Sequence, residues 1–182
     1  MKLSRVPALV LLVLTCVPAA FASCEAAGYQ WYPNYDQIAN GRPSRDECWN
    51  PFNAFYTTQA PSPWGNTNAY EFNYAGSISQ TFVVPADHPQ THWELAYTLE
   101  FNDPHNDGAW NRFSMEVRDM TTGTALTWYS FNGAGGDQNW EMHRQGFTTG
   151  NIAGHTIRVL FRGSKGYSDT YIRVAGVALW QY

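Results

Sequence analysis

The segment from Asn102 to Arg112 gathers polar, planar and aromatic side chains between two stretches of alternating residues. Carbohydrate recognition uses this mixture, because an indole face packs against the C–H patch of a pyranose while carboxylate, amide and guanidinium groups hydrogen-bond to vicinal hydroxyls. We therefore predict ligand contacts from Asp103, Asn106, Asp107, Trp110 and Arg112. The alternative is that Asp103 and Asn106 only stabilise turns and that Trp110 folds back as a plug.

A second candidate loop runs from Asn132 to Asn139 and contains three glycines. Its polar residues suit sugar hydroxyls, and we predict Asp137 and Asn139 as ligand-binding residues. A phosphate cradle is disfavoured, because no helix follows the glycines to supply its N-terminus. The alternative is a long hairpin loop without a ligand, and we expect the neighbouring Trp140 to be part of the framework.

The third candidate is a polar sheet face around Trp128. Trp128 and Tyr129 are consecutive, so in a strand they point to opposite faces and at most one of them belongs to the core. We predict Trp128 as an exposed ligand-binding residue on a shallow face that also carries charged side chains: His92, Glu94, Glu100, Glu116 and Arg118. Cross-strand pairing between glutamate and arginine explains these charges equally well.

Catalysis is the second hypothesis for this chain. Glycoside hydrolysis needs two carboxylates at a fixed separation, which Asp103 with Asp107, or Glu94 with Glu100, would supply. No feature separates either pair from ordinary surface acids, and no Gly-x-Ser-x-Gly motif is found. His88 and His92 are four residues apart, but Pro89 lies between them and no helix is expected there, so this spacing does not favour a zinc site. We favour non-catalytic carbohydrate binding, with a small polysaccharide-active enzyme and a structural or adhesive envelope protein as the alternatives.

Short alternating stretches must position these side chains. They have period 2, are separated by Gly, Pro, Asn and Asp, and predict strands near 70–74, 78–84, 92–101, 113–118, 125–131, 156–162 and 171–180. This pattern predicts an all-β jelly-roll sandwich of two antiparallel sheets, after an irregular aromatic-rich segment over 23–69. Gly176 is expected to mark a bulge.

The aromatic residues divide into two groups. Five of them lie on the apolar face of alternating stretches and are expected to fill the core: Trp93, Tyr97, Phe101, Phe113 and Phe161. Trp31, Trp49 and Trp64 are expected to cap one end of the sandwich. With 16% aromatic and 14% charged residues in 182, the composition excludes intrinsic disorder and a coiled coil.

The N-terminus reads as a signal peptide over residues 1–22. Lys2 and Arg5 precede the apolar stretch Val6–Val17, which is too short to span a bilayer, and Ala20-Phe21-Ala22 fits a cleavage site. We therefore expect a secreted, monomeric chain with one domain over residues 23–182. With 11 Lys+Arg against 15 Asp+Glu the chain is acidic, which excludes a nucleic-acid partner.

Two cysteines remain after cleavage, Cys24 and Cys48. An even pair in an oxidising compartment predicts a disulfide that ties the N-terminal segment to the start of the core. The alternative is that Cys24 is a lipid-anchored N-terminus, because residues 20–24 resemble a loose bacterial lipobox. Phe21 fits that motif poorly, and lipidation would leave Cys48 without a partner.

Three stretches carry a resemblance to galactose-binding-like jelly-roll domains. GSISQTFVVPA (Gly76–Ala86), NWEMHRQGFTTGNIAGHTIRVLFRG (Asn139–Gly163) and YIRVAGVALW (Tyr171–Trp180) are similar to segments of that family, and the resemblance extends from Tyr70 to the C-terminus. It implies a jelly roll similar to carbohydrate-binding modules, a fold that hosts glycan binding, adhesion and structural roles.

The family often holds a structural calcium ion through acidic residues, one of them in the last strand. Aligned on Val177–Leu179, the family's acidic pair falls on Ala175 and Gly176 of this sequence, whose side chains offer no oxygen to a hard cation. The resemblance alone would allow a structural calcium ion, but this departure from the family's pattern argues against that site, and we expect no cofactor here.

Overall fold

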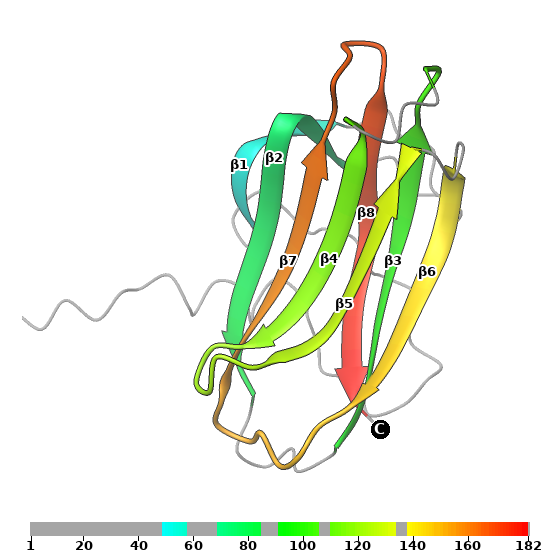
Figure 1. The fold of residues 1–182 in the computed structure, drawn as a ribbon. Coiled ribbons are helices and arrows are strands. Elements are labelled where there is room, and N and C mark those ends of the chain that lie inside the picture. Colours follow the sequence, from blue (N-terminus) through cyan, green and yellow to red (C-terminus); the bar gives the residue numbers. More distant parts are fainter. Residues whose placement is uncertain (1–48, 58–68, 85–90, 106–109, 134–137, 182) are drawn as a thin grey trace, which may run out of the picture.

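The computed structural model describes residues 49–57, 69–84, 91–105, 110–133 and 138–181. These residues form eight strands and no α-helix, which confirms the predicted all-β class (Figure 1). The strands are β1 (Asn50–Thr57), β2 (Ala69–Val83), β3 (His92–Asn102), β4 (Arg112–Asp119), β5 (Ala125–Asn132), β6 (Gln138–Thr148), β7 (Thr156–Ser164) and β8 (Tyr171–Gln181).

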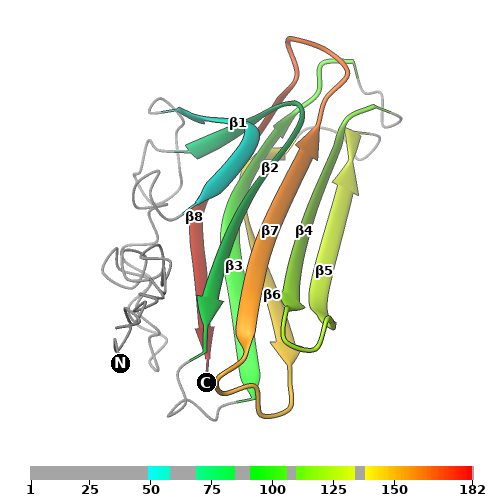
Figure 2. The same cartoon turned by 90° about the vertical axis from the view of Figure 1, so that its left-hand side faces the viewer.

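The strands curl into two antiparallel layers (Figures 1 and 2). Their order is β5-β4-β7-β2-β8-β3-β6, and β1 pairs with β2 outside this path. The long strand β2 joins the layers, because residues 75–83 pair with β7 while Tyr70 and Glu71 pair with β8. We call β5-β4-β7-β2 the front layer and β8-β3-β6 the back layer. The end strands approach each other, since the rings of Tyr129 on β5 and His143 on β6 lie 5.3 Å apart.

The core lies between the layers, where the alternating pattern places it. The five aromatic residues predicted for it are each at most 1% exposed, which confirms the prediction. Tyr97 from the back layer meets Phe161 from the front layer edge-on at 5.1 Å between ring centroids. Trp49 is 3% exposed and lies 5.9 Å from Phe161, so it belongs to the core beside the middle of β7. Residues 31 and 64 lie outside the described part of the chain.

Strand β1 corrects the prediction that residues up to 69 are irregular. It lies in that segment and runs antiparallel along β2 (Figure 2). Pro51 and a bulge beside Asn53, whose φ is 48°, interrupt the alternation that would have indicated a strand. The stretches near 70–74 and 78–84, predicted as two strands, form one strand, because β2 continues through Gly76. A Cβ atom at Gly76 would collide with the backbone of Asn53, so the glycine permits this close approach of β1.

Two further sequence features have clear outcomes. The register between β3 and β8 shifts by one residue between Ala175 and Ala178, which confirms the bulge expected at Gly176. The predicted signal peptide and the predicted disulfide partners Cys24 and Cys48 lie outside the described residues. In the described part, no helix is long and apolar enough to cross a membrane.

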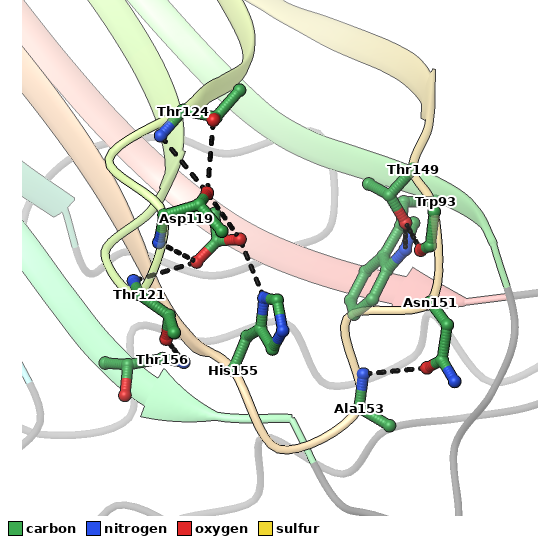
Figure 3. A network of polar contacts seen from close by, with 11 residues as sticks. Trp93, Asp119, Thr121, Thr124, Thr149, Asn151, Ala153, His155 and Thr156 are labelled. Atoms are coloured by element: carbon green, nitrogen blue, oxygen red, sulfur yellow. Dashed lines mark hydrogen bonds and ion pairs between the residues drawn. The ribbon is translucent and has the colours of Figure 1, made fainter.

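The end of the sandwich that holds the β4–β5 turn is closed by a polar network centred on Asp119 (Figure 3). The buried Asp119 carboxylate accepts hydrogen bonds from the Thr121 and Thr122 backbone N–H groups at 2.8 and 3.2 Å, and its Oδ2 lies 2.8 Å from His155 Nδ1. Burial alone would raise the pKa of Asp119, but the hydrogen bonds from His155, Thr122 and Thr121 outweigh it and hold the pKa below its usual range. This network fixes the β4–β5 turn against the β6–β7 loop.

Candidate functional site

Three connections meet at the other end of the sandwich, around the buried Asn111. The Asn111 carbonyl accepts a hydrogen bond from the Gly133 N–H at 3.0 Å, and its side-chain Oδ1 accepts one from the Gly166 N–H at 2.8 Å. Asn111 and Gly133, which belong to the two loops predicted from the sequence after β3 and after β5, therefore lie side by side. The third connection, 165–170 between β7 and β8, was not predicted, because its short polar sequence carries no motif.

Asp103 and Trp110 have different environments in this end. Asp103 is 3% exposed and accepts a hydrogen bond from the His105 backbone N–H at 3.1 Å. It thus stabilises a turn, which was the alternative to ligand binding. Its carboxylate also lies where a side chain at position 133 would be, so a larger residue there would have to displace Asp103. Trp110 is 64% exposed and does not fold back as a plug. Asn106, Asp107 and Asp137 lie outside the described residues, and Asn139 is exposed at the start of β6.

An exposed cluster links the loop after β3 to the third connection. The His105 ring stacks on Tyr167 with centroids 3.9 Å apart, and His105 Nε2 lies 2.9 Å from Asp169 Oδ1. This hydrogen bond lowers the pKa of the Asp169 carboxyl. The cluster orders the loop end, and no signal in the sequence links residues 64 positions apart.

A groove of about 630 Å³ crosses the outer face of the front layer. It is lined by Phe52 of β1 and by three consecutive residues from each of four strands: Ala75–Ser77, Arg112–Ser114, Ser130–Asn132 and Arg162–Ser164. The register aligns these segments, because Arg162 lies opposite both Ser77 and Ser114. The groove therefore runs across the strands rather than along them.

Small side chains create this hollow. Alternate residues of each strand point outward, and along the groove the outward positions include an alanine and four serines: Ala75, Ser77, Ser114, Ser130 and Ser164. Larger groups stand at its margins, since Phe52 is 66% exposed at the β1 end. At the loop end, the Ser164 hydroxyl donates to the Trp110 carbonyl at 3.4 Å, which places the Trp110 loop beside the groove.

Trp128 stands next to the groove on the edge strand β5, two residues from Ser130 on the same face. It is 69% exposed, while Tyr129 is half-buried and packs toward the core. This confirms that the two consecutive aromatics point to opposite faces. Of the predicted residues, the front layer thus brings together Arg112 and Trp128, with Trp110 at the adjoining loop.

The charged residues predicted around Trp128 separate into two groups. Glu116 and Arg118 share its face, but His92, Glu94 and Glu100 lie on β3 in the back layer, so the predicted single charged face is wrong. Alternation fixes the face of a strand but not the layer to which that strand belongs.

Glu116 shows the cross-strand pairing that was the alternative for these charges. Its two carboxylate oxygens accept hydrogen bonds from Arg118 at 2.8 and 3.0 Å, and Oε1 also accepts one from Arg158 at 3.3 Å. The hydrogen bond from Arg118 is the largest influence and lowers the pKa of Glu116, with burial acting against it.

The carboxylate pair Glu94 and Glu100 is occupied by ion pairs with different partners. Glu94 Oε1 lies 3.5 Å from Arg144, and Glu100 Oε2 accepts a hydrogen bond from Arg173 at 3.0 Å. Burial raises the pKa of Glu100 despite the neighbouring Arg173. Within the described residues, no group of three or more His, Cys, Asp or Glu side chains is placed to hold a metal ion.

A buried ion network lies beneath the third connection and was missed at the sequence level. The Glu71 carboxylate accepts hydrogen bonds from Lys165 at 3.3 Å and from Arg173 at 2.8 Å, and the Glu71 and Lys165 side chains are 7% and 6% exposed. Both cations lie over the Tyr171 ring. This network anchors the start of the 165–170 connection to β2.

No protein-family model and no curated protein matches the chain. Solved structures match it at low sequence identity. The carbohydrate-binding module TmCBM61, solved with β-1,4-galactotriose, has 10% identity and a TM-score of 0.51, over 74% of this chain and 88% of that one.

Two further matches are larger proteins. The enzymatically active domain of tailspike protein 4 from bacteriophage CBA120 has 11% identity and a TM-score of 0.52, over 84% of this chain and 22% of that one. An exo-β-agarase has 9% identity and a TM-score of 0.51, over 76% of this chain and 24% of that one. The chain thus shares the all-β jelly-roll fold of these structures, TmCBM61 among them, which is the fold that its sequence predicts.

Proposed function

We propose that this protein binds a glycan, without catalysis, in the groove across the front layer. The observation that carries the proposal is the groove itself, which combines a floor of small side chains with exposed aromatic rings at its margins. Sugar rings stack on exposed aromatic faces, and hydroxyl-bearing residues beneath them exchange hydrogen bonds with sugar hydroxyls.

The dimensions favour an oligosaccharide over a single sugar. The floor extends from β2 through β7 and β4 to β5. With neighbouring strands roughly 4.8 Å apart, these four strands span about 14 Å. Phe52 and Trp128 stand toward opposite ends of this span, so a chain of several sugar rings lying across the strands would reach both.

The matched structures support a glycan as the ligand but leave catalysis to be tested. TmCBM61 was solved with a galactotriose, whereas the tailspike domain and the agarase are described as enzymes. In the described part of this chain the carboxylates considered for hydrolysis are paired or buried. New reducing ends or unsaturated sugars after incubation with polysaccharide would favour the enzyme hypothesis instead.

Calorimetric titration with a panel of soluble polysaccharides tests the proposal. Ser114 lies at the centre of the groove floor, so Ser114→Phe should abolish binding by filling the groove. Thr148→Phe adds the same group at an exposed position of β6 in the back layer and should leave binding unchanged. Trp128→Ala should weaken binding about tenfold, since an aromatic stacking contact contributes roughly 1–1.5 kcal/mol.

Other outcomes would count against the groove. Loss of binding in Trp110→Ala but not in Ser114→Phe would move the site to the loop end, where the sequence first placed it. No binding by the wild type to any glycan, with an apolar partner surface found instead, would favour the adhesive protein.

We also propose that the chain is secreted as a monomer whose Cys24 and Cys48 form a disulfide. Mass spectrometry of the mature protein should give the mass of a chain whose first residue is Ser23. This mass should increase by two hydrogens when the disulfide is reduced. A lipid adduct on Cys24 would establish the anchored form instead.

A further inference from the structure

The groove is lined by the two arginines that have no ion pair within the described part of the chain. Seven arginine and lysine side chains are described, and five of them lie within 4.0 Å of a carboxylate: Arg118, Arg144, Arg158, Lys165 and Arg173. Within the described residues, Arg112 and Arg162 have neither an ion pair nor a side-chain hydrogen bond. Both are exposed and both line the groove.

The register places these two guanidinium groups together. Arg112 lies opposite Ser164, and Arg162 lies opposite Ser114, so the two arginines are diagonal neighbours on the outer face of β4 and β7. Diagonal neighbours in an antiparallel pair are roughly 7–8 Å apart at Cα, within reach of two long side chains toward one group. The serines between them are too small to separate them.

The surrounding face does not neutralise these charges. Beside Arg112 and Arg162, the outward positions of β4, β5, β7 and the β2 stretch that pairs with β7 (75–83) carry Arg118 and Arg158 but, among the described residues, a single carboxylate, Glu116. Glu116 already accepts hydrogen bonds from both of its neighbours. The described residues of this face therefore carry an excess of three positive charges, on a chain whose formal net charge is −4.

We infer that the groove selects an acidic glycan, whose carboxylate or sulfate group lies between Arg112 and Arg162. This inference rests on the proposed function and specifies its ligand class. Guanidinium groups bind oxyanions with two parallel, charge-assisted hydrogen bonds, and such bonds are about twice as strong as neutral ones. The acidic remainder of the protein repels a polyanion, so the local positive face directs it to the groove.

Three polymers built on galactose units separate charge from sugar type: neutral β-1,4-galactan, polygalacturonate with carboxylates, and carrageenan with sulfate esters. We expect at least one acidic polymer to bind about tenfold or more tightly than the neutral one. The acidic polymer that binds more tightly identifies the anionic group. Affinity should fall steadily between roughly 0.05 and 0.5 M NaCl, as exposed charges become screened.

Arginine variants locate the anion. Arg162→Gln and Arg112→Gln should each lower affinity for the acidic polymer about tenfold while leaving the melting temperature unchanged, because both side chains are exposed. Arg118→Gln is the matched control, since it removes one arginine charge from the same face outside the groove. It should change the affinity less than about threefold.

Different binding results would reject the anion preference and the assignment of glycan binding to the groove. If neutral and acidic polymers bind equally and Ser114→Phe abolishes both, the groove binds glycans but the anion preference is wrong. If Arg118→Gln weakens binding as much as Arg162→Gln, the overall charge of the face attracts the polymer and no specific anion site exists. The inference is then also wrong. If no polymer binds at all, both are wrong.

Discussion

The buried network at Glu71 offers a quantitative test of how the loop end is held. Glu71→Gln removes the carboxylate that Lys165 and Arg173 share, and Arg173 keeps its second partner, Glu100. Lys165 has no other described carboxylate and its side chain is 6% exposed, so the substitution leaves a buried ammonium without a counter-charge. Breaking a buried pair in this way costs about 3–5 kcal/mol.

For a domain of this size, such a loss corresponds to a melting temperature about 6–20 °C lower. Urea unfolding followed by tryptophan fluorescence measures the free energy, and scanning calorimetry measures the melting temperature. Glu116→Gln is the matched control, because it also breaks pairs with two arginines but on the outer face, and it should cost less than about 1 kcal/mol.

A double variant tests the stated cause. Glu71→Gln with Lys165→Met removes the stranded charge and replaces it with an apolar side chain of similar length, so it should regain most of the lost stability. The reasoning is refuted if Glu71→Gln costs less than about 1 kcal/mol, or if the double variant is no more stable than Glu71→Gln alone.

Two other substitutions probe the remaining framework. Asp119→Asn should lower the free energy of unfolding by about 1.5–3 kcal/mol at neutral pH. The hydrogen bonds that lower the pKa of Asp119 stabilise the fold at pH values above the ordinary pKa of this group, 3.8. That stability is lost as pH falls through the lowered pKa, so the free energies of unfolding of the variant and the wild type should converge in acid. An equal difference between them in acid and at neutral pH would contradict the assignment. Gly163→Ala should destabilise by about 1–3 kcal/mol, because a Cβ there would overlap the buried Phe72 ring, whereas Gly146→Ala, whose nearest neighbour would be 3.9 Å away, should be nearly neutral in the same unfolding assay.

The core and the exposure of single side chains were predictable from the sequence, because period-2 alternation assigns each residue to a face. Trp93 and Phe161 belong to the core for this reason, and Trp128 and Tyr129 had to point in opposite directions. The bulge at Gly176 was predictable from the glycine within an alternating stretch.

The groove was not predictable, because it depends on which strands become neighbours. Ser77, Ser114 and Ser130 are unremarkable in the sequence and form a floor only when β2, β7, β4 and β5 align in register. The same topology separates Glu94 from Glu116 and brings Asn111 and Gly133, from the two candidate loops, into contact. Long-range pairing, which local pattern does not encode, therefore determines the site.

The most direct test of the central claim is amide chemical-shift mapping while an oligosaccharide that binds is titrated into the protein. We predict that the largest changes follow the groove across four strands, at residues 75–77, 112–114, 130–132 and 162–164. Changes confined to the loop end around residues 103–111 and 165–170, or to the back layer, would contradict the assignment of glycan binding to the groove.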